Sequence, residues 1–151
     1  MSLELRPYQT ELVDKLRDAL RQYRSVLCVS PTGSGKTALA AFMIGRAAAK
    51  GLRVWMTVHR DFLLTQTASA LDMAGVRYGF IAAGREFDRH RRVHVVSINT
   101  ARRRLATLVR PDLIIIDECA HAPAKSWAEV IDWATGGDRN VHSVGLTATP
   151  A

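Results

Sequence analysis

The chain has 151 residues, a length that suits one domain with its own buried core. Hydrophobic residues make up 48% of it and charged residues 23%, which excludes a disordered chain, and no apolar run approaches the roughly 20 residues that span a bilayer. The formal net charge of +7 suits a polyanionic partner such as nucleic acid, although an arginine-rich composition alone is weak evidence. No signal-peptide pattern opens the chain, so the cytoplasm is the expected compartment.

Short β-branched runs alternate with helical patterns along the chain, an order typical of a parallel α/β sheet. In chain order the patterns predict a helix over residues 9–23, a strand over 25–30, a helix over 36–50, a strand over 53–58, a helix over 61–73, strands over 78–82 and 93–97, a helix over 99–108, a strand over 113–116, a helix over 126–134 and a strand over 142–147. Strands without polar alternation are buried on both faces, so helices must cover each side. The sequence therefore predicts a doubly wound, mostly parallel sheet in a single domain of residues 1–151.

Three residues are predicted to mark helix ends. Gly51 and Gly75 follow the second and third predicted helices, where glycine readily adopts the left-handed conformation of a helix terminus. Asp61 is predicted to cap the start of the third helix with its carboxylate.

Cysteine and tryptophan are expected to be packing residues. Two cysteines, Cys28 and Cys119, are too few for a disulfide framework and form no CxxC pair, so buried thiols are expected. Trp55, Trp127 and Trp133 are expected to pack in the core rather than to stack on bases.

A glycine-rich turn, SPTGSGKT at residues 30–37, follows a predicted buried strand and opens a predicted helix. Its glycines let successive backbone N–H groups point at phosphate oxygens, and the helix N-terminus adds partial positive charge. Lys36 would reach the β- and γ-phosphates, and the Thr37 hydroxyl would bind Mg²⁺. The predicted ATP-binding residues of this turn, which a kinase or GTPase would share, are Pro31, Thr32, Gly33, Ser34, Gly35, Lys36 and Thr37.

A second motif, LIIIDE at residues 113–118, ends an apolar strand with two carboxylates. Asp117 would hold Mg²⁺, largely through water, and Glu118 would orient the attacking water. Glu118 favours a hydrolase over a kinase, and the alternative is an acidic pair that caps the next helix. Lys36, Asp117 and Glu118 are therefore the predicted catalytic residues.

These motifs and their flanks resemble the N-terminal RecA-like lobe of superfamily 2 DEAD/DEAH-type helicases, which are P-loop NTPases, over nearly the whole chain. The order of LRPYQ, PTGSGKT, DEC and GLTATP is most similar to the RadD- and XPB-like or type III restriction subunit-like branch. LRPYQ at residues 5–9 resembles the adenine-recognising segment of these motors, which implies that Gln9 reads the adenine edge and Arg6 stacks on the ring.

Two further segments, VHRDFLLTQ at residues 58–66 and VSINT at 96–100, resemble the motifs that track a nucleic-acid strand in this family. Such segments hold the sugar-phosphate backbone. An arginine run at 102–104, which we expect to begin a helix beside the second motif, suggests further phosphate contacts, although a solvated face is the ordinary explanation. The implied nucleic-acid contacts are His59, Arg60, Gln66, Asn99, Thr100, Arg102 and Arg103.

The remaining resemblances concern residues that couple ATP hydrolysis to movement between lobes in this family. DECAH at residues 117–121 is similar to a DEAH-type box, but Ala120 stands where the family has His or Asp, and His121 follows one place later. GLTATP at 145–150 resembles the motif whose hydroxyls, here Thr147 and Thr149, couple hydrolysis to movement between lobes.

The resemblance implies an ATP-dependent helicase or translocase that uses ATP and Mg²⁺ to move along or unwind nucleic acid, with DNA favoured over RNA. The family's second lobe and its arginine would follow residue 151, so the chain alone is expected to bind ATP weakly and hydrolyse little. The alternatives are a restriction-enzyme-type DNA translocase subunit, an unrelated P-loop NTPase or kinase, and a non-catalytic nucleotide- or nucleic-acid-binding module.

Overall fold

The computed structural model describes residues 7–29, 33–117, 124–136 and 141–147. In chain order its elements are α1 (Pro7–Gln22), β1 (Ser25–Val29), α2 (Gly33–Ala49), β2 (Val54–Val58), α3 (Leu63–Met73), β3 (Gly79–Ile81), β4 (Val93–Ser97), α4 (Ile98–Arg104), the 3-10 helix η1 (Leu105–Thr107), β5 (Leu113–Ile116), α5 (Ala124–Ala134) and β6 (His142–Thr147). Among these elements no helix is both long and apolar enough to cross a membrane.

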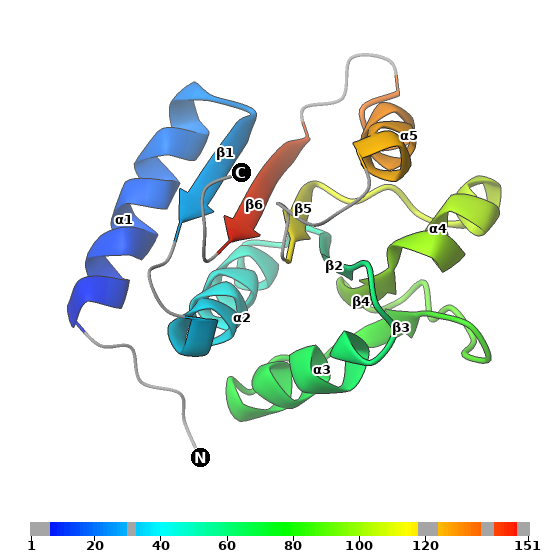
Figure 1. The fold of residues 1–151 in the computed structure, drawn as a ribbon, viewed down its shortest axis with the longest axis horizontal. Coiled ribbons are helices and arrows are strands. Elements are labelled where there is room, and N and C mark those ends of the chain that lie inside the picture. Colours follow the sequence, from blue (N-terminus) through cyan, green and yellow to red (C-terminus); the bar gives the residue numbers. More distant parts are fainter. Residues whose placement is uncertain (1–6, 30–32, 118–123, 137–140, 148–151) are drawn as a thin grey trace.

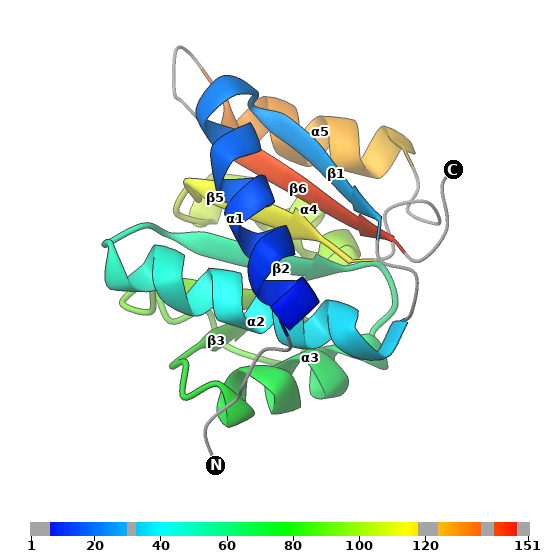
Figure 2. The same ribbon diagram turned by 90° about the vertical axis from the view of Figure 1, so that its left-hand side faces the viewer.

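The strands form one sheet in the order β1-β6-β5-β2-β4-β3, and each neighbouring pair is parallel. Figures 1 and 2 show α2 and α3 on one side of this sheet and α5 on the other. Parallel strands need crossover connections, and the helices that make these crossovers cover both faces. The predicted doubly wound α/β fold is confirmed.

Alternate side chains of the strands enter two separate cores. On β2, Met56 packs against the α1, α2 and α3 side, whereas its neighbour Trp55 packs against the α4 and α5 side. The same alternation places Ile115 in the first core and Ile114 in the second. This follows from the two-residue period of a strand, which points successive side chains to opposite faces.

The predictions for tryptophan and for Cys28 are confirmed. Trp55 is fully buried and stacks on Trp133, with ring centroids 5.4 Å apart and planes 26° from parallel. Trp127 is also buried in the second core. Cys28 lies in the first core, and its burial raises the pKa of the thiol. Cys119 lies outside the described residues.

Glycine ends α2 and α3 as predicted. Gly51 and Gly75 have φ values of 88° and 74°, the left-handed conformation. The N–H of Gly75 donates to the Asp72 carbonyl at 3.1 Å, and the next N–H, of Val76, donates to the Leu71 carbonyl at 3.0 Å. This pair of bonds is the Schellman arrangement, which satisfies carbonyls that the helix itself leaves open.

The predicted role of Asp61 as a helix cap is wrong. Helix α3 begins at Leu63, and the preceding residue, Phe62, has helical φ and ψ values and makes no capping bond. The Asp61 carboxylate instead accepts a hydrogen bond of 3.1 Å from the hydroxyl of Ser97, at the end of β4. The Asp61 carboxylate therefore bonds to a residue of β4 instead of a backbone N–H at the start of α3.

The predicted position of the arginine run is also wrong. Helix α4 begins at Ile98, directly after β4, so the run 102–104 forms its last turn, and the chain continues as η1. Positive side chains are favoured at this end because the helix dipole leaves partial negative charge there. Helices α1 and α2 also begin earlier than predicted, at Pro7 and Gly33, and α5 begins at Ala124.

Candidate nucleotide-binding site

Lys36 and Asp117 meet at the edge of the sheet formed by the carboxyl ends of the strands. Lys36 lies near the start of α2, and Asp117 directly follows β5. Strand β6 separates β1 from β5, yet the Lys36 Nζ lies 3.1 Å from the Asp117 Oδ1. Both residues are buried, with 3% and 6% of their surfaces exposed. The parallel sheet thus brings together two groups 81 residues apart, because all its strands end at one edge.

A buried threonine on β2 fixes the backbone around Asp117. The Asp117 N–H donates to the Thr57 carbonyl at 3.0 Å, and the Thr57 hydroxyl donates to the Ile115 carbonyl at 2.8 Å. Thr57 is fully buried, so this hydroxyl needs such an acceptor. Thr57 was not among the predicted site residues, although a single hydroxyl inside the apolar strand VWMTV was a signal for it.

The charges of this pair must be considered together. Two buried charges are stable only when they compensate each other, and at 3.1 Å Lys36 and Asp117 do so. The contact is an ion pair without hydrogen-bond geometry, because the buried Oδ1 atom has no hydrogen-bond partner among the described residues. An oxygen in that state suits a ligand such as Mg²⁺ or a metal-bound water. The residues present therefore fit a metal-nucleotide complex.

The structure describes some of the other predicted ATP-binding residues. Gly33, Ser34 and Gly35 form the first turn of α2, and Thr37 follows Lys36 and is partly buried. Gln9 belongs to the first turn of α1, and Figure 1 shows that α1 starts at the end of the fold where β1 terminates. Arg6, Pro31, Thr32 and Glu118 lie outside the described residues.

The two segments with predicted nucleic-acid contacts leave the same edge side by side. Strands β2 and β4 are neighbours, with Val58 in register with Ser97. The bond between Ser97 and Asp61 joins the two segments directly after these strands. Arg60, Gln66 and Asn99 are exposed, whereas His59 is only partly exposed.

Arg102 has an internal partner instead of a free guanidinium. Its Nε and Nη2 donate to the Glu129 carboxylate at 2.9 and 3.1 Å, and its Nη1 donates to the Ser126 hydroxyl at 3.0 Å. These bonds raise the pKa of Arg102 and lower that of Glu129. Helix α5 therefore competes with any phosphate for Arg102.

The remaining candidates differ in exposure. Arg103 is exposed, whereas Thr100 is 4% exposed. Thr147 is buried at the end of β6, between β1 and β5, and so lies at the edge where Lys36 and Asp117 meet. His121 and Thr149, the other predicted coupling residues, lie outside the described residues.

A family model described as "Type III restriction enzyme, res subunit" matches residues 2–151. The chain belongs to this family. The chain is also 31% identical over 159 aligned residues to a Halobacterium salinarum protein that bears the name of the DNA 3'-5' helicase Rad25. That alignment covers 99% of the chain and 24% of the relative.

Two solved structures share the fold of this res-subunit family member. The UvsW helicase from bacteriophage T4 matches with a TM-score of 0.74 and 19% identity, over 97% of this chain and 53% of that one. The Type ISP restriction-modification enzyme LlaGI, solved with a DNA substrate mimic, matches with a TM-score of 0.70 and 18% identity, over 97% of this chain and 18% of that one. The resemblance to the first RecA-like lobe of superfamily 2 helicases is thereby confirmed, and the chain spans about a quarter of its curated relative.

Proposed function

We propose that this chain is the ATP-binding lobe of a DNA helicase or translocase, and that Lys36, Thr37, Asp117 and Glu118 act on Mg²⁺-ATP. The main support is the contact of 3.1 Å between Lys36 and Asp117, buried at the edge where α/β sheets bind ligands. Membership of the res-subunit family agrees with this assignment. DNA is the proposed polymer because Rad25 is named as a DNA helicase and LlaGI was solved with a DNA mimic.

The chemistry of the chain's own residues follows from this pair. Without nucleotide, Lys36 and Asp117 neutralise each other. Bound Mg²⁺-ATP would supply the transferable phosphoryl group and the charge of the metal ion. Lys36 would then contact the β- and γ-phosphates, Thr37 and Asp117 would hold the metal ion, largely through water, and Glu118 would orient the attacking water. Gln9 and Arg6 would hold the adenine.

The neighbouring segments suit a single DNA strand. The exposed Arg60 and Asn99 follow the ends of two adjacent strands, Gln66 is exposed in α3, and Arg103 adds an exposed charge from α4. His59, Thr100 and Arg102 complete the proposed contacts, with Arg102 exchanging Glu129 for phosphate. Thr147, Thr149 and His121 are the proposed coupling residues, because Thr147 ends the strand between the two ATP-binding strands.

Hydrolysis and movement are proposed for a protein that also contains the second lobe. An arginine supplied from another part of a phosphoryl-transfer enzyme contributes about 10³ to 10⁵ in rate. These 151 residues alone should therefore bind Mg²⁺-ATP but turn it over slowly. The family match equally favours a restriction-type DNA translocase subunit, which would use the same site.

The test measures the Mg²⁺-dependent binding of a fluorescent ATP analogue by equilibrium fluorescence titration. Lys36→Met should weaken binding at least about tenfold, a loss of about 1.4 kcal/mol. Arg46→Met, which removes an exposed cation from the other end of α2, is the matched control and should bind normally. Asp117→Asn should lose the Mg²⁺ dependence. If the unaltered chain binds no analogue, or Lys36→Met binds as well as the control, the proposal is wrong and a non-catalytic module is favoured.

A further inference from the structure

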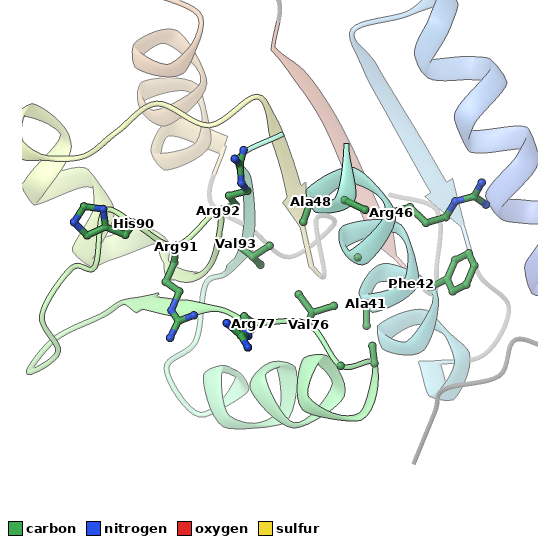
Figure 3. A pocket seen from close by; sticks show the side chains of 14 residues that line it. Ala41, Phe42, Arg46, Ala48, Val76, Arg77, His90, Arg91, Arg92 and Val93 are labelled. Carbon is green, nitrogen blue, oxygen red and sulfur yellow. The ribbon is translucent and has the colours of Figure 1, made fainter. Parts of the chain in front are cut away.

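A cavity of about 710 Å³ opens at the edge of the sheet opposite Lys36 and Asp117. The C-terminal half of α2, the connection from α3 to β3 and the segment that enters β4 form its walls (Figure 3). Its lining includes Arg92 and Val93, at the amino end of β4, and no residue of the candidate nucleotide-binding site. The cavity is therefore a separate feature of the fold.

The lining is strongly basic. Its described residues include Arg46, Arg77, Arg91, Arg92 and His90, and none of them has an acidic side chain. Arg91 lies 3.7 Å from Asp88, and Arg92 donates to the Gly51 carbonyl at 2.6 Å, so both have partners within the fold.

Two of these arginines are available for a ligand. Arg46 and Arg77 are exposed, and neither forms an ion pair with another described residue. Arg46 lies over the ring of Phe42, 5.6 Å from its centroid, and Figure 3 shows its side chain directed toward α1, so that Arg46 and Arg77 lie on opposite sides of the cavity and a bound segment would have to cross it to reach both. Their charge is therefore not compensated from within the described part of the chain.

The floor of the cavity is apolar. Figure 3 shows the side chains of Ala48, Val76 and Val93 directed toward its middle. Helix α2 approaches this floor closely at Gly45, where an added Cβ would lie 3.2 Å from the Val76 Cγ2. Small side chains on α2 thus leave a hollow that a large apolar side chain of a partner can fill.

We propose that this cavity docks an acidic segment of a partner protein, with an apolar side chain on the floor and carboxylates on Arg46 and Arg77. The combination of an apolar centre and a charged rim is the usual anatomy of a protein interface. The net charge of +7 would also steer an acidic partner toward the chain. This role is additional to the proposed ATP and DNA sites and does not depend on them.

A nucleic acid fits the cavity less well. Sites for single strands combine a basic groove with several aromatic rings on which bases stack. Phe42 and His90 are the aromatic side chains among the described lining residues; Figure 3 shows them at opposite ends of the lining, so they form no continuous stacking surface, and Arg46 lies over the Phe42 ring. A floor of alanine and valine offers nothing to a phosphate backbone.

The experiment measures fluorescence anisotropy of a fluorescein-labelled peptide in which leucines alternate with glutamates. This peptide should bind, and versions with glutamine for glutamate or alanine for leucine should bind at least about tenfold more weakly, since each loses one of the two recognition elements. Arg46→Glu and Arg77→Glu should each weaken binding of the first peptide by at least about tenfold. Arg24→Glu, at an exposed arginine between α1 and β1 that does not line the cavity, is the matched control and should leave it unchanged.

Three outcomes would overturn the proposal. The first is absence of binding by the glutamate-leucine peptide, and the second is binding that Arg46→Glu and Arg77→Glu leave intact. The third is a labelled single-stranded oligonucleotide that displaces the peptide and loses its own binding in Arg77→Glu, which would assign the cavity to nucleic acid. Binding of the ATP analogue, measured on the same variants, should be unaffected, so failure here is distinguishable from failure of the nucleotide site.

Discussion

Positive side chains are buried and paired at the carboxyl ends of the strands, but exposed and unpaired with carboxylates of the described residues at the amino ends. At the carboxyl ends of the strands, Lys36 is 3% exposed and lies against Asp117. At the amino ends, Arg46 and Arg77 are exposed and have no carboxylate partner among the described residues. A buried charge must be compensated within the fold, whereas water compensates an exposed one. At the carboxyl ends, a ligand that binds Lys36 must therefore displace Asp117. At the amino ends, a ligand can bind Arg46 or Arg77 without displacing a carboxylate of the described residues.

One helix connects these two edges. Helix α2 begins at the glycine-rich turn and contains Lys36 near its start and Arg46 near its end. Its dipole favours anions at the first position and cations at the second. Lys36 and Arg46 can thus be compared as two positive side chains of one helix, of which the first is buried and the second is exposed.

The largest expected effect is on Lys36. Lys36→Met should lower the free energy of unfolding by about 3–5 kcal/mol, because it leaves Asp117 buried without a partner. Arg46→Met should change it by less than about 0.5 kcal/mol. Urea denaturation measures both values, and the double variant Lys36→Met/Asp117→Asn should lose less than the two single losses combined. Equal decreases in the free energy of unfolding for Lys36→Met and Arg46→Met would contradict the claim that only the buried charge needs a partner within the fold.

Gly75, at the end of α3 beside the basic cavity, should show an effect of the backbone alone. Its φ is 74°, and an added Cβ would have no atom within 4 Å. Gly75→Ala should therefore cost about 1–2 kcal/mol of stability through the left-handed conformation. Gly75→Asn should cost less, since asparagine tolerates this conformation. A thermal denaturation series tests the order Gly, Asn, Ala, and a neutral Gly75→Ala would contradict the backbone argument.

His94 should make stability depend on pH. This residue is 2% exposed near the start of β4, and burial lowers its pKa below the usual 6.5, despite the hydrogen bond of its Nε2 to the Asp88 carbonyl. The unfolded chain then binds a proton more readily than the folded one, so stability is full above about pH 6.5 and falls as the pH decreases toward the folded pKa. Melting temperatures between pH 7.5 and pH 5 should decrease, and His94→Gln should flatten this dependence. If the melting temperature of His94→Gln depends on pH as steeply as that of the unaltered chain, other groups cause the pH dependence.

The smallest effect is expected for Arg102, which is partly exposed and paired. Arg102→Gln and Glu129→Gln should each lower the melting temperature slightly, and the double variant should lose no more than either single one. Because Arg102 lowers the pKa of Glu129, the contribution of the pair is present above the ordinary glutamate pKa and disappears as the pH falls through the folded one. Arg103→Gln, whose side chain is exposed on the same helix, is the control and should have no effect.

Much of the fold could be predicted because its signals are local. Apolar runs and helical spacing identified each strand and helix, and Gly51 and Gly75 marked helix ends through their own conformational freedom. The order of a strand, a glycine-rich turn and a helix also identified Lys36 and Thr37 as phosphate-binding candidates. The wrong predictions, the Asp61 cap and the arginine run as a helix start, both concern helix ends. Asp61 bonds to Ser97 of β4 instead of capping α3, and α4 begins directly after β4, so the arginines fall in its last turn. The functional roles of the site residues stay predictions.

The sequence by itself determined the kind of elements, their order and the two motifs, since periodicity and turn chemistry act over a few residues. Only the tertiary structure decided that β6 lies between β1 and β5, that Lys36 nevertheless reaches Asp117, and that Thr57 fixes the backbone of this aspartate. It also decided that Arg102 pairs with α5 and that Arg46 and Arg77 line one cavity. These relations depend on strand order and on contacts between distant segments, which no local pattern encodes.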